Sequence, residues 1–295
     1  MSVSARWLLL ACVVAGCGRV GFDTIASVGS NDGGPDAPTM LGPWSPPETL
    51  PNADSATDDE EDIALSANKL EAYFGVGPDD QSSPKVLRTM TRTSVTAAWG
   101  PDTKLVVANQ SQWSTGPRLT PDDLTLYFNT TAAGGPGGQN IFQVTRTSLS
   151  GAWGNAAPVP DVNDDDDEQW MAPCAGGRYV LARSDPSSHF SLYEGVLGSG
   201  VAPAISSLED AGANKSGPFL TADCLTLYFS SDITGNGDLF VTHRTTPTAA
   251  WETPTPLDEF NSSADEGDPW LSADGRLFAF SSTRNGTDDV FFATR

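Results

Sequence analysis

A unit of about 50 residues recurs along this chain and constrains its fold more than any other feature. The two clearest copies are residues 217–244 and 268–295. Each copy runs from an apolar segment through an Asp-containing turn to an apolar-aromatic segment that ends in Ser-Ser. A Gly/Asn-rich loop and a last apolar-aromatic segment ending in Arg follow. Such segments, broken by Asp and Gly turns, are typical of short antiparallel strands, so each copy predicts three strands joined by two hairpin loops.

The same unit occurs five times in all. Its copies begin at Leu65, Leu119, Pro173, Leu220 and Leu271. Between them recurs a short segment in which Trp is followed by Pro and then by Leu or Val. It begins at Trp44, Trp99, Trp153 and Trp251, with a degenerate copy without Trp at Val201, at spacings of 55, 54, 48 and 50 residues. A period near 50 residues with about four strands predicts a blade of a β-propeller, because a lone four-stranded sheet needs neighbours to bury both faces.

The order of the segments predicts how the ring closes. The first Trp segment precedes the first hairpin, and the last hairpin has no Trp segment after it. The simplest arrangement pairs residues 44–50 beside Val290–Thr294, so that the N-terminal strand completes the last blade. We therefore predict an all-β fold in which residues 44–295 form a five-bladed β-propeller closed by an N-terminal strand. The four Trp residues at one repeat position are expected to pack between strands.

The copies resemble the WD40-like repeats of periplasmic TolB-type β-propellers, whose pattern reads P-x-L-S-x-D-G-x-x-L-Y-F-x-S followed by D-[IL]-[FY]-V. The last copy matches at Pro269, Leu271, Ser272, Asp274, Gly275, Leu277, Phe280 and Ser282, and the fourth at Pro218, Leu220, Thr221, Asp223, Tyr228, Phe229, Ser231 and Asp238. The turn departs from the pattern at Asn68-Lys69 and at Cys174–Gly177. The resemblance covers most of residues 44–295 and implies a fold rather than one activity, and the six blades usual in TolB are not reached.

The N-terminus reads as an export signal. A single Arg6 precedes an apolar run from Trp7 to Ala15, which is too short to span a bilayer and is typical of a signal peptide. The run ends Val14-Ala15-Gly16-Cys17 and resembles a bacterial lipobox. The resemblance implies that residues 1–16 are removed and that Cys17 carries the lipid that anchors the protein to a membrane. An ordinary secretory signal with an incidental Cys is the alternative.

A flexible linker is predicted for residues 17–43, which are rich in Gly, Asp, Ser, Asn and Pro and hold little apolar content. Gly18 follows Cys17 where an inner-membrane retention signal would usually place Asp, so the resemblance favours the outer membrane and a periplasm-facing protein. The formal net charge of the chain is −22, and no stripe of Lys or Arg is visible. Because phosphate binding needs such a stripe, nucleic acid is excluded as a partner. We expect a monomer.

Three of the five copies carry Asp-Glu just before the innermost strand. The pairs are Asp59-Glu60, Asp167-Glu168 and Asp265-Glu266. This position faces the mouth of a propeller channel, so the pairs predict an acidic well for Ca²⁺ or a cationic group. In the alternative interpretation the acids cap turns and accept hydrogen bonds from backbone amides between blades. The identity of any metal stays unknown.

Trp113, Trp170 and Trp270 are expected near the same channel face. A Trp exposed beside acids is a platform for carbohydrate, whereas a buried Trp packs between blades. The expected partner is therefore an envelope protein, with a glycan as the alternative. Glycoside hydrolysis also uses paired carboxylates, but these pairs are equivalent and nothing separates an acid from a base. We assign no catalytic residue and expect a binding or scaffold module rather than an enzyme.

Two cysteines remain in the exported domain, because Cys12 leaves with the signal and Cys17 is lipidated. Cys174 and Cys224 each fall at the first hairpin turn of adjacent blades. An even pair in an exported protein favours a disulfide, which would join blades three and four. Two free thiols are the alternative, since disulfide geometry is narrow.

Overall fold

A computed structural model describes residues 41–51, 58–78, 83–109, 113–185, 187–209 and 212–295. Leu41–Arg295 forms one compact unit. The predicted signal peptide, the predicted lipidation site Cys17 and the predicted linker as far as Met40 lie outside the described residues.

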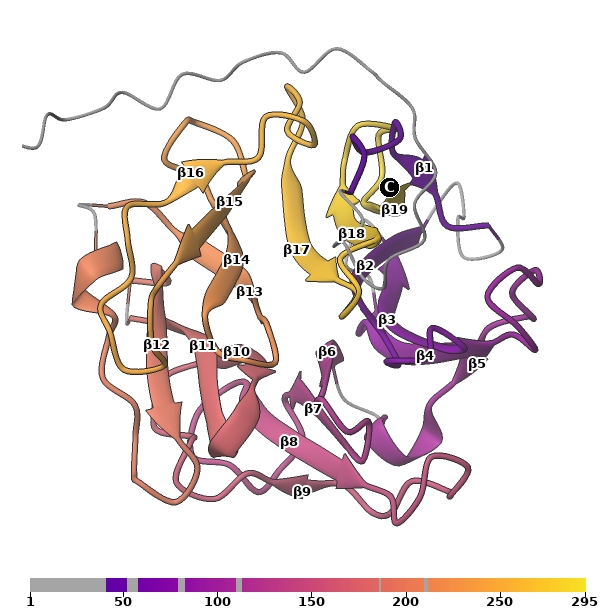
Figure 1. Cartoon of the computed structure of the whole chain (residues 1–295). Helices are drawn as coiled ribbons and strands as arrows, with labels where there is room; N and C mark the ends of the chain where they lie inside the picture. The colour runs from indigo at the N-terminus through magenta and orange to yellow at the C-terminus, as the bar shows by residue number, and fades with distance from the viewer. Residues whose placement is uncertain (1–40, 52–57, 79–82, 110–112, 186, 210–211) are drawn as a thin grey trace, which may run out of the picture. The chain divides into compact units, whose positions relative to one another are not determined.

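The described chain folds into β-sheets arranged in a ring around a central axis (Figure 1). Blade one holds β2 (Asp58–Leu65), β3 (Glu71–Pro78), β4 (Val86–Thr91) and β5 (Thr103–Lys104). Blade two holds β6 (Ser114–Leu119), β7 (Thr125–Thr130), β8 (Asn140–Thr145) and β9 (Ala157–Pro158). Blade three holds β10 (Glu168–Pro173), β11 (Arg178–Ser184) and β12 (Phe190–Val196). Blade four holds β13 (Lys215–Leu220), β14 (Thr226–Ser231), β15 (Asp238–His243) and β16 (Thr255–Pro256).

Blade five is completed by the N-terminal strand. Its sheet orders β1 (Glu48–Thr49) beside β19 (Asp289–Thr294), then β18 (Leu277–Ser282) and β17 (Glu266–Leu271). Glu48 pairs with Phe292 and Thr49 with Phe291. Each innermost strand also contacts the innermost strands of both neighbouring blades, so the ring is closed. The five-bladed propeller and its closure by the N-terminal strand are confirmed.

Blade three lacks the fourth strand that its neighbours have. Where the degenerate copy at Val201 predicts this strand, the structure has only an isolated bridge between Tyr193 and Ala204. In the other four blades an Arg at the end of the third strand lies over the Trp of the outer segment. These pairs are Arg92 with Trp99, Arg146 with Trp153, Arg244 with Trp251 and Arg295 with Trp44. Blade three has neither residue at these positions, so its outer segment lacks this cation–π contact.

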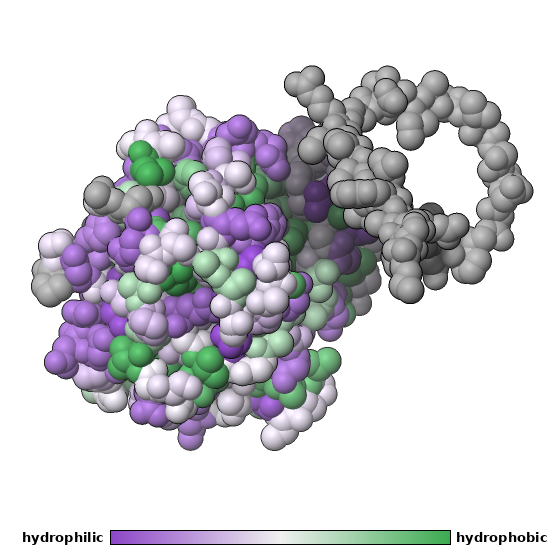
Figure 2. Space-filling view, turned by 60° about the vertical axis from the view of Figure 1, so that its left-hand side comes forward, coloured by the Kyte–Doolittle hydropathy of each residue, from purple (hydrophilic) through white to green (hydrophobic). Residues whose placement is uncertain are grey.

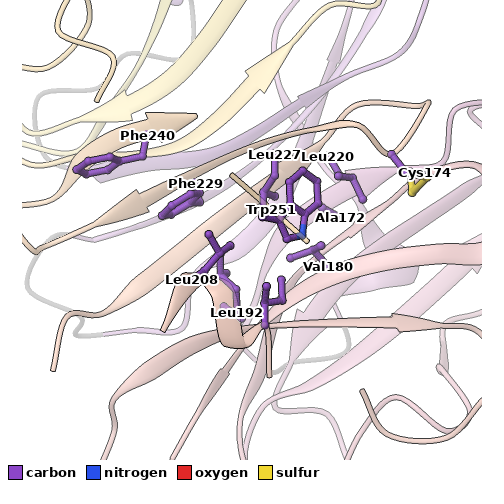
Figure 3. Packing of buried hydrophobic residues seen from close by; sticks show 13 residues of the cluster. Ala172, Cys174, Val180, Leu192, Leu208, Leu220, Leu227, Phe229, Phe240 and Trp251 are labelled. Atoms are coloured by element: carbon purple, nitrogen blue, oxygen red, sulfur yellow. A yellow bond between two sulfur atoms is a disulfide. The ribbon is translucent and has the colours of Figure 1, made fainter. Parts of the chain in front are cut away.

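The apolar core is divided among the contacts between neighbouring blades. One buried cluster lies between each adjacent pair of blades among the described residues. Figure 3 shows the cluster between blades three and four, where Trp251 lies among Leu220, Leu227 and Val180. Outside, the face in Figure 2 is a mixture of polar side chains and small apolar patches. The blades therefore hold one another through side-chain packing, as a ring of sheets requires.

A disulfide joins blades three and four. Cys174 and Cys224 are bonded, with their Cα atoms 5.5 Å apart and 50 residues between them in sequence. Cys174 lies just before the short 3₁₀ helix η2 (Ala175–Gly177), and Cys224 lies in the turn between β13 and β14. The bond therefore joins the first hairpin turns of two blades (Figure 3).

Breaking this bond should lower the free energy of unfolding by about 2–4 kcal/mol, because the crosslink restricts the unfolded chain. The comparison is urea unfolding of the oxidised protein against the Cys174→Ser, Cys224→Ser double variant. Thiol titration of the unreduced, denatured domain should find neither cysteine free. Two titratable thiols, or equal unfolding midpoints, would contradict the expectation.

Candidate functional site

Each innermost strand carries a bulge at the same place, and one residue of each bulge has a left-handed backbone. These residues, called the bulge ring below, are Asp62 (φ 62°), Gly116 (φ 65°), Trp170 (φ 52°), Gly217 (φ 54°) and Asp268 (φ 51°). Left-handed backbone is rare for residues other than Gly, although Asp adopts it more readily than most. A bulge redirects the side chain it carries. The bulge ring therefore places two carboxyls and one indole around the channel.

Asp62 connects three members of the bulge ring. Its Oδ2 accepts a hydrogen bond from the backbone N–H of Gly116 at 3.0 Å, and its Oδ1 accepts one from Trp170 Nε1. Its carboxylate also interacts with that of Asp268 in the neighbouring blade. A Cβ at Gly217 would lie 2.6 Å from Oδ1 of Asp268, so only Gly leaves room for this carboxyl. The ring thus brings two carboxyl groups from blades one and five into direct contact.

A polar cavity of about 360 Å³ opens where the innermost strands begin, and it is called the mouth cavity below. Its carboxyl-bearing residues are Glu61, Asp232, Asp265, Glu266, Asp268 and Asp288. Its other residues are Trp170, Asn214, Ser216, Ser230, Ser231, Gly237, Gly267 and Ser281. The cavity therefore combines carboxyl groups, hydroxyls, an amide and one indole, which are the groups that bind polar ligands.

Three carboxyls at this cavity have raised pKa values. Burial and the neighbouring Asp62 raise the pKa of Asp268 well above its usual range. Burial and Asp268 do the same to the pKa of Asp288. Burial and Asp62 raise the pKa of Glu61 to about 8, although Lys85 opposes the shift. Desolvation and like charge both disfavour the ionised form, so each of these carboxyls is harder to ionise than a carboxyl in water.

Two buried cations face these acids. Lys85 Nζ lies 2.6 Å from Glu61 Oε2 and 3.1 Å from Asp59 Oδ2. Arg118 extends from the innermost strand of blade two toward blade four, where its Nε donates to the carbonyl of Pro218 at 3.2 Å. Burial lowers the pKa of Arg118, whereas Asp62 and Asp268 both favour its charged form. The charges of the acids in and beside the bulge ring are therefore only partly balanced.

A second cavity of about 390 Å³ lies at the opposite end of the channel, where the first hairpin turns meet. Arg118 and Trp270 line it together with mostly apolar residues such as Leu65 and Phe219. Because Arg118 also interacts with Asp62, its side chain lies between this cavity and the acids of the bulge ring.

The Asp of each predicted Asp-Glu pair accepts a backbone hydrogen bond from the preceding blade. Asp59 accepts from the N–H of Asp288 at 3.3 Å, Asp167 from that of Gln139 at 2.7 Å, and Asp265 from that of Gly237 at 2.8 Å. These are the contacts that the alternative interpretation predicts, in which the acids connect neighbouring blades. The cation-binding role of the pairs stays a prediction.

The Glu of each pair is buried within its own blade. Glu168 Oε1 accepts from Arg183 Nε at 3.0 Å, and Glu266 Oε1 lies 3.0 Å from Arg284 Nη2. Burial and the adjacent Asp164 raise the pKa of Glu168 to about 9, although Arg183 opposes the shift. Glu60 is 2 % exposed. The carboxyls of Glu168 and Glu266 therefore make their main contacts with arginines inside the blades.

The three Trp residues do not gather at one mouth. Trp170 lines the mouth cavity, and its ring meets Phe190 edge-on with centroids 5.8 Å apart. Trp270 lies at the opposite cavity, is 7 % exposed and packs against Phe219. Trp113 precedes β6, is half-buried and is not among the described residues that line the mouth cavity. The prediction of a shared face is therefore wrong for Trp270, because that residue follows the bulge near the far end of its strand.

Sequence reasoning gave no separate role to Asp62, Asp268, Asp288 or Arg118. The repeat does contain a signal for Asp62 and Asp268. In both copies, at 59–62 and at 265–268, an Asp stands two positions after the Glu of the Asp-Glu pair. The third copy has Trp170 at this position. No comparable signal marks Arg118 or Asp288, whose roles depend on the closed ring.

Within the described ranges, no group of three or more His, Cys, Asp or Glu residues is arranged to hold a metal ion. Over the same ranges, no helix is both long enough and apolar enough to cross a membrane.

Comparison with protein-family models finds no match, and comparison with curated proteins finds none either. Among solved structures, the chain is similar to a putative TolB from Agrobacterium tumefaciens, with 14% identity and a TM-score of 0.48 over 76% of this chain and 69% of that one. TolB from Acinetobacter baumannii gives 14% identity and a TM-score of 0.48 over 81% and 55% of the two chains. An α-L-arabinanase from Penicillium chrysogenum gives 15% identity and a TM-score of 0.49 over 79% and 75%. These likenesses concern propeller architecture.

Proposed function

We propose that this chain is an exported, lipid-anchored β-propeller that acts as a binding module of the cell envelope and takes its ligand in the mouth cavity. One observation carries the proposal. The mouth cavity is a polar hollow of about 360 Å³ at the end of a channel whose five blades are fixed by ring closure. Preformed hollows with converging polar groups are the usual form of ligand sites.

The carboxyl geometry favours binding over glycoside hydrolysis. Retaining glycosidases hold their two carboxyls about 5–5.5 Å apart, and inverting ones hold them about 6.5–9.5 Å apart. The side chains of Asp62 and Asp268 instead interact with each other, so that Asp62 raises the cost of ionising Asp268. Glu168 and Glu266 are engaged with arginines inside their blades.

A glycan is the second candidate ligand, and Trp170 is the observation that favours it. Its indole lines the mouth cavity beside Asn214 and four serines. Aromatic rings and hydrogen-bonding side chains together recognise the apolar faces and hydroxyls of sugars. An envelope protein remains the first candidate because the chain is expected to be tethered in the envelope.

Export and anchoring are tested at Cys17. In a bacterial host, Cys17→Ala should move the protein from the membrane fraction to the soluble fraction, because the acyl chains on this sulfur are the proposed anchor. Labelling with a radioactive fatty acid should mark the wild type and not the variant. Unchanged membrane fractionation and unchanged labelling would contradict the lipid anchor.

Ligand binding is tested by filling the mouth cavity. Ser216→Trp should reduce recovery of the bound partner at least tenfold, because the indole would occupy the cavity. Crosslinking in envelope preparations followed by mass spectrometry measures protein partners, and a glycan array measures sugars. Ser150→Trp is the matched control, since Ser150 is exposed in the loop after β8. Equal recovery by both variants would overturn the placement of the site, provided that both melt like the wild type.

A further inference from the structure

The walls of the mouth cavity carry an imbalance of charge. Six of its residues bear carboxyl groups, and none of the described residues lining it is Lys or Arg. Five of the six accept a hydrogen bond or form an ion pair, including Glu61 with Lys85 Nζ at 2.6 Å and Asp268 with Ser281 Oγ at 2.9 Å. Asp232 accepts from Asn214 at 2.8 Å, Asp265 accepts from Gly237, and Glu266 is held by Arg284. Only Lys85 and Arg284 among these partners are cations, so the six carboxyls carry more negative charge than their partners balance.

The surrounding charges do not remove this imbalance. Lys85 lies against both Glu61 and Asp59, so one ammonium serves two carboxyls. Arg118 faces both Asp62 and Asp268 from the other side of the bulge ring. Seven groups thus face one another here, namely Asp59, Glu61, Asp62, Asp268, Asp288, Lys85 and Arg118. With five acids against two cations, the cluster is balanced either by protons or by added positive charge.

A second observation points to a ligand that donates hydrogen bonds. Ser231 lines the same cavity, is only 3 % exposed, and its Oγ has no hydrogen-bond partner. A buried hydroxyl without a partner costs free energy that a bound donor would recover. The indole of Trp170 lies on the wall of the same cavity, and the face of an indole attracts a cation.

We propose that the ligand of the mouth cavity is an organic cation, an alkylammonium or alkylguanidinium group such as a Lys or Arg side chain presents, and that its binding displaces protons from Asp268, Asp288 and Glu61. The inference rests on the proposed function, because it gives the chemical class of the ligand bound at that same site. Cation–π contact with Trp170 and hydrogen bonds to the carboxylates and to Ser231 would hold the group.

The direction of the pH dependence follows from the protonated acids. A cation favours their ionised forms, so protons leave when it binds. Its affinity should therefore rise with pH until these carboxyls are already ionised. Because the pKa of Glu61 is about 8, the rise should extend from about pH 6 to about pH 9. A guanidinium keeps its charge over this whole range, so the trend belongs to the protein.

The experiment is isothermal titration calorimetry of the lipid-free domain with n-butylguanidinium, n-butylammonium and n-butanol. Both cations should bind at least tenfold more tightly than the alcohol, and the affinity for the guanidinium should rise at least tenfold from pH 6 to pH 9. Titration at pH 7 in buffers of different ionisation enthalpy should show that protons are released when the cation binds, because these carboxyls have raised pKa values. The stronger of the two cations identifies the preferred side chain.

Matched variants test whether Asp268 and Asp288 bind the cation. Asp268→Asn and Asp288→Asn should each lower affinity for the guanidinium at least tenfold and flatten its pH dependence. Asn tolerates the left-handed backbone at position 268, so the first variant should fold. Glu48→Gln removes one exposed charge from the outermost strand β1 and should change neither quantity. A circular dichroism melt identifies any variant that fails to fold. The affinity of the other variant for the guanidinium then decides whether these carboxyls bind the cation.

Equal binding of n-butanol, or affinity independent of pH, would overturn the inference. If no cation binds while Ser216→Trp still abolishes capture of the partner, the cation class is wrong and the proposed function stands. If Ser216→Trp leaves capture intact, the site itself is wrong.

Discussion

Removing residues 41–50 should destabilise the domain more than any single substitution. This segment supplies β1, whose residues pair with β19, and Leu50 donates its backbone N–H to Val290 at 2.8 Å. Leu50 is 1 % exposed in the cluster between blades five and one, and burial of this kind contributes about 2–5 kcal/mol when tested by truncation to Ala. Trp44 packs on Phe260 and Phe278. We expect a loss of at least about 5 kcal/mol, which exceeds the lower end of the stability of a typical domain.

The comparison is urea unfolding of residues 41–295 against residues 51–295, followed by tryptophan fluorescence. The shorter protein should unfold at much lower urea or lose its cooperative transition, because blade five then exposes the edge of β19. Leu50→Ala in the longer protein should give part of the loss, and Glu48→Ala in the same strand should give little because Glu48 is exposed. Equal midpoints for the two lengths would show that the ring does not need this strand.

The closure could be predicted because it depends on order alone. Four Trp segments and five hairpins are visible in sequence, and the first segment has no hairpin before it. Pairing residues 44–50 beside Val290–Thr294 was the simplest way to give the last hairpin a fourth strand, and β1 lies there. Repeats make such inferences possible because each copy must find the same neighbours.

The prediction of a fourth strand in blade three is wrong for a related reason. The copy at Val201 keeps the spacing of the repeat but not its Trp. The third strand of the same blade ends without the Arg that elsewhere lies over that Trp and bonds the first hairpin turn, as Arg92 Nε does with the carbonyl of Lys69. Spacing therefore identifies where a strand would lie, and the contacts of particular side chains decide how far its pairing extends, which in blade three is a single bridge between Tyr193 and Ala204.

The candidate site was only partly predictable. The repeat located the acids near the channel, because the Asp-Glu pairs begin the innermost strands. It did not show that Asp62 and Asp268 meet, since this depends on bulges with left-handed backbone in two strands that lie side by side only after the ring closes. A one-residue bulge also changes the direction of every side chain near it. The period of the repeat alone could not reveal this change in the direction of the side chains.

The largest single-residue effect is expected at Arg183. Its side chain is 4 % exposed and holds Glu168 at 3.0 Å and Asp164 at 3.2 Å, while the Glu168 side chain is fully buried. At high pH, where Glu168 is ionised, Arg183→Ala leaves two carboxylates together without a cation, and removing one partner of a buried ion pair costs about 3–5 kcal/mol. Lys69→Ala is the matched control, because the pair of Lys69 with Asp274 is partly exposed and should be worth about 0.2–1 kcal/mol.

The pH dependence separates lost charge balance from lost packing at Arg183. Arg183 lowers the pKa of Glu168, which burial and Asp164 hold at about 9. Removing the guanidinium raises this folded-state pKa further, while the unfolded value stays near 4.5. A raised folded-state pKa means that stability is lost as pH rises from the unfolded value through the folded value. Urea unfolding should therefore show a larger cost of Arg183→Ala at pH 9 than at pH 5, where Glu168 is protonated in both proteins. A cost equal at both pH values would mean that Arg183 acts through packing alone, and a cost no larger than that of Lys69→Ala would mean that the buried pair does not stabilise blade three.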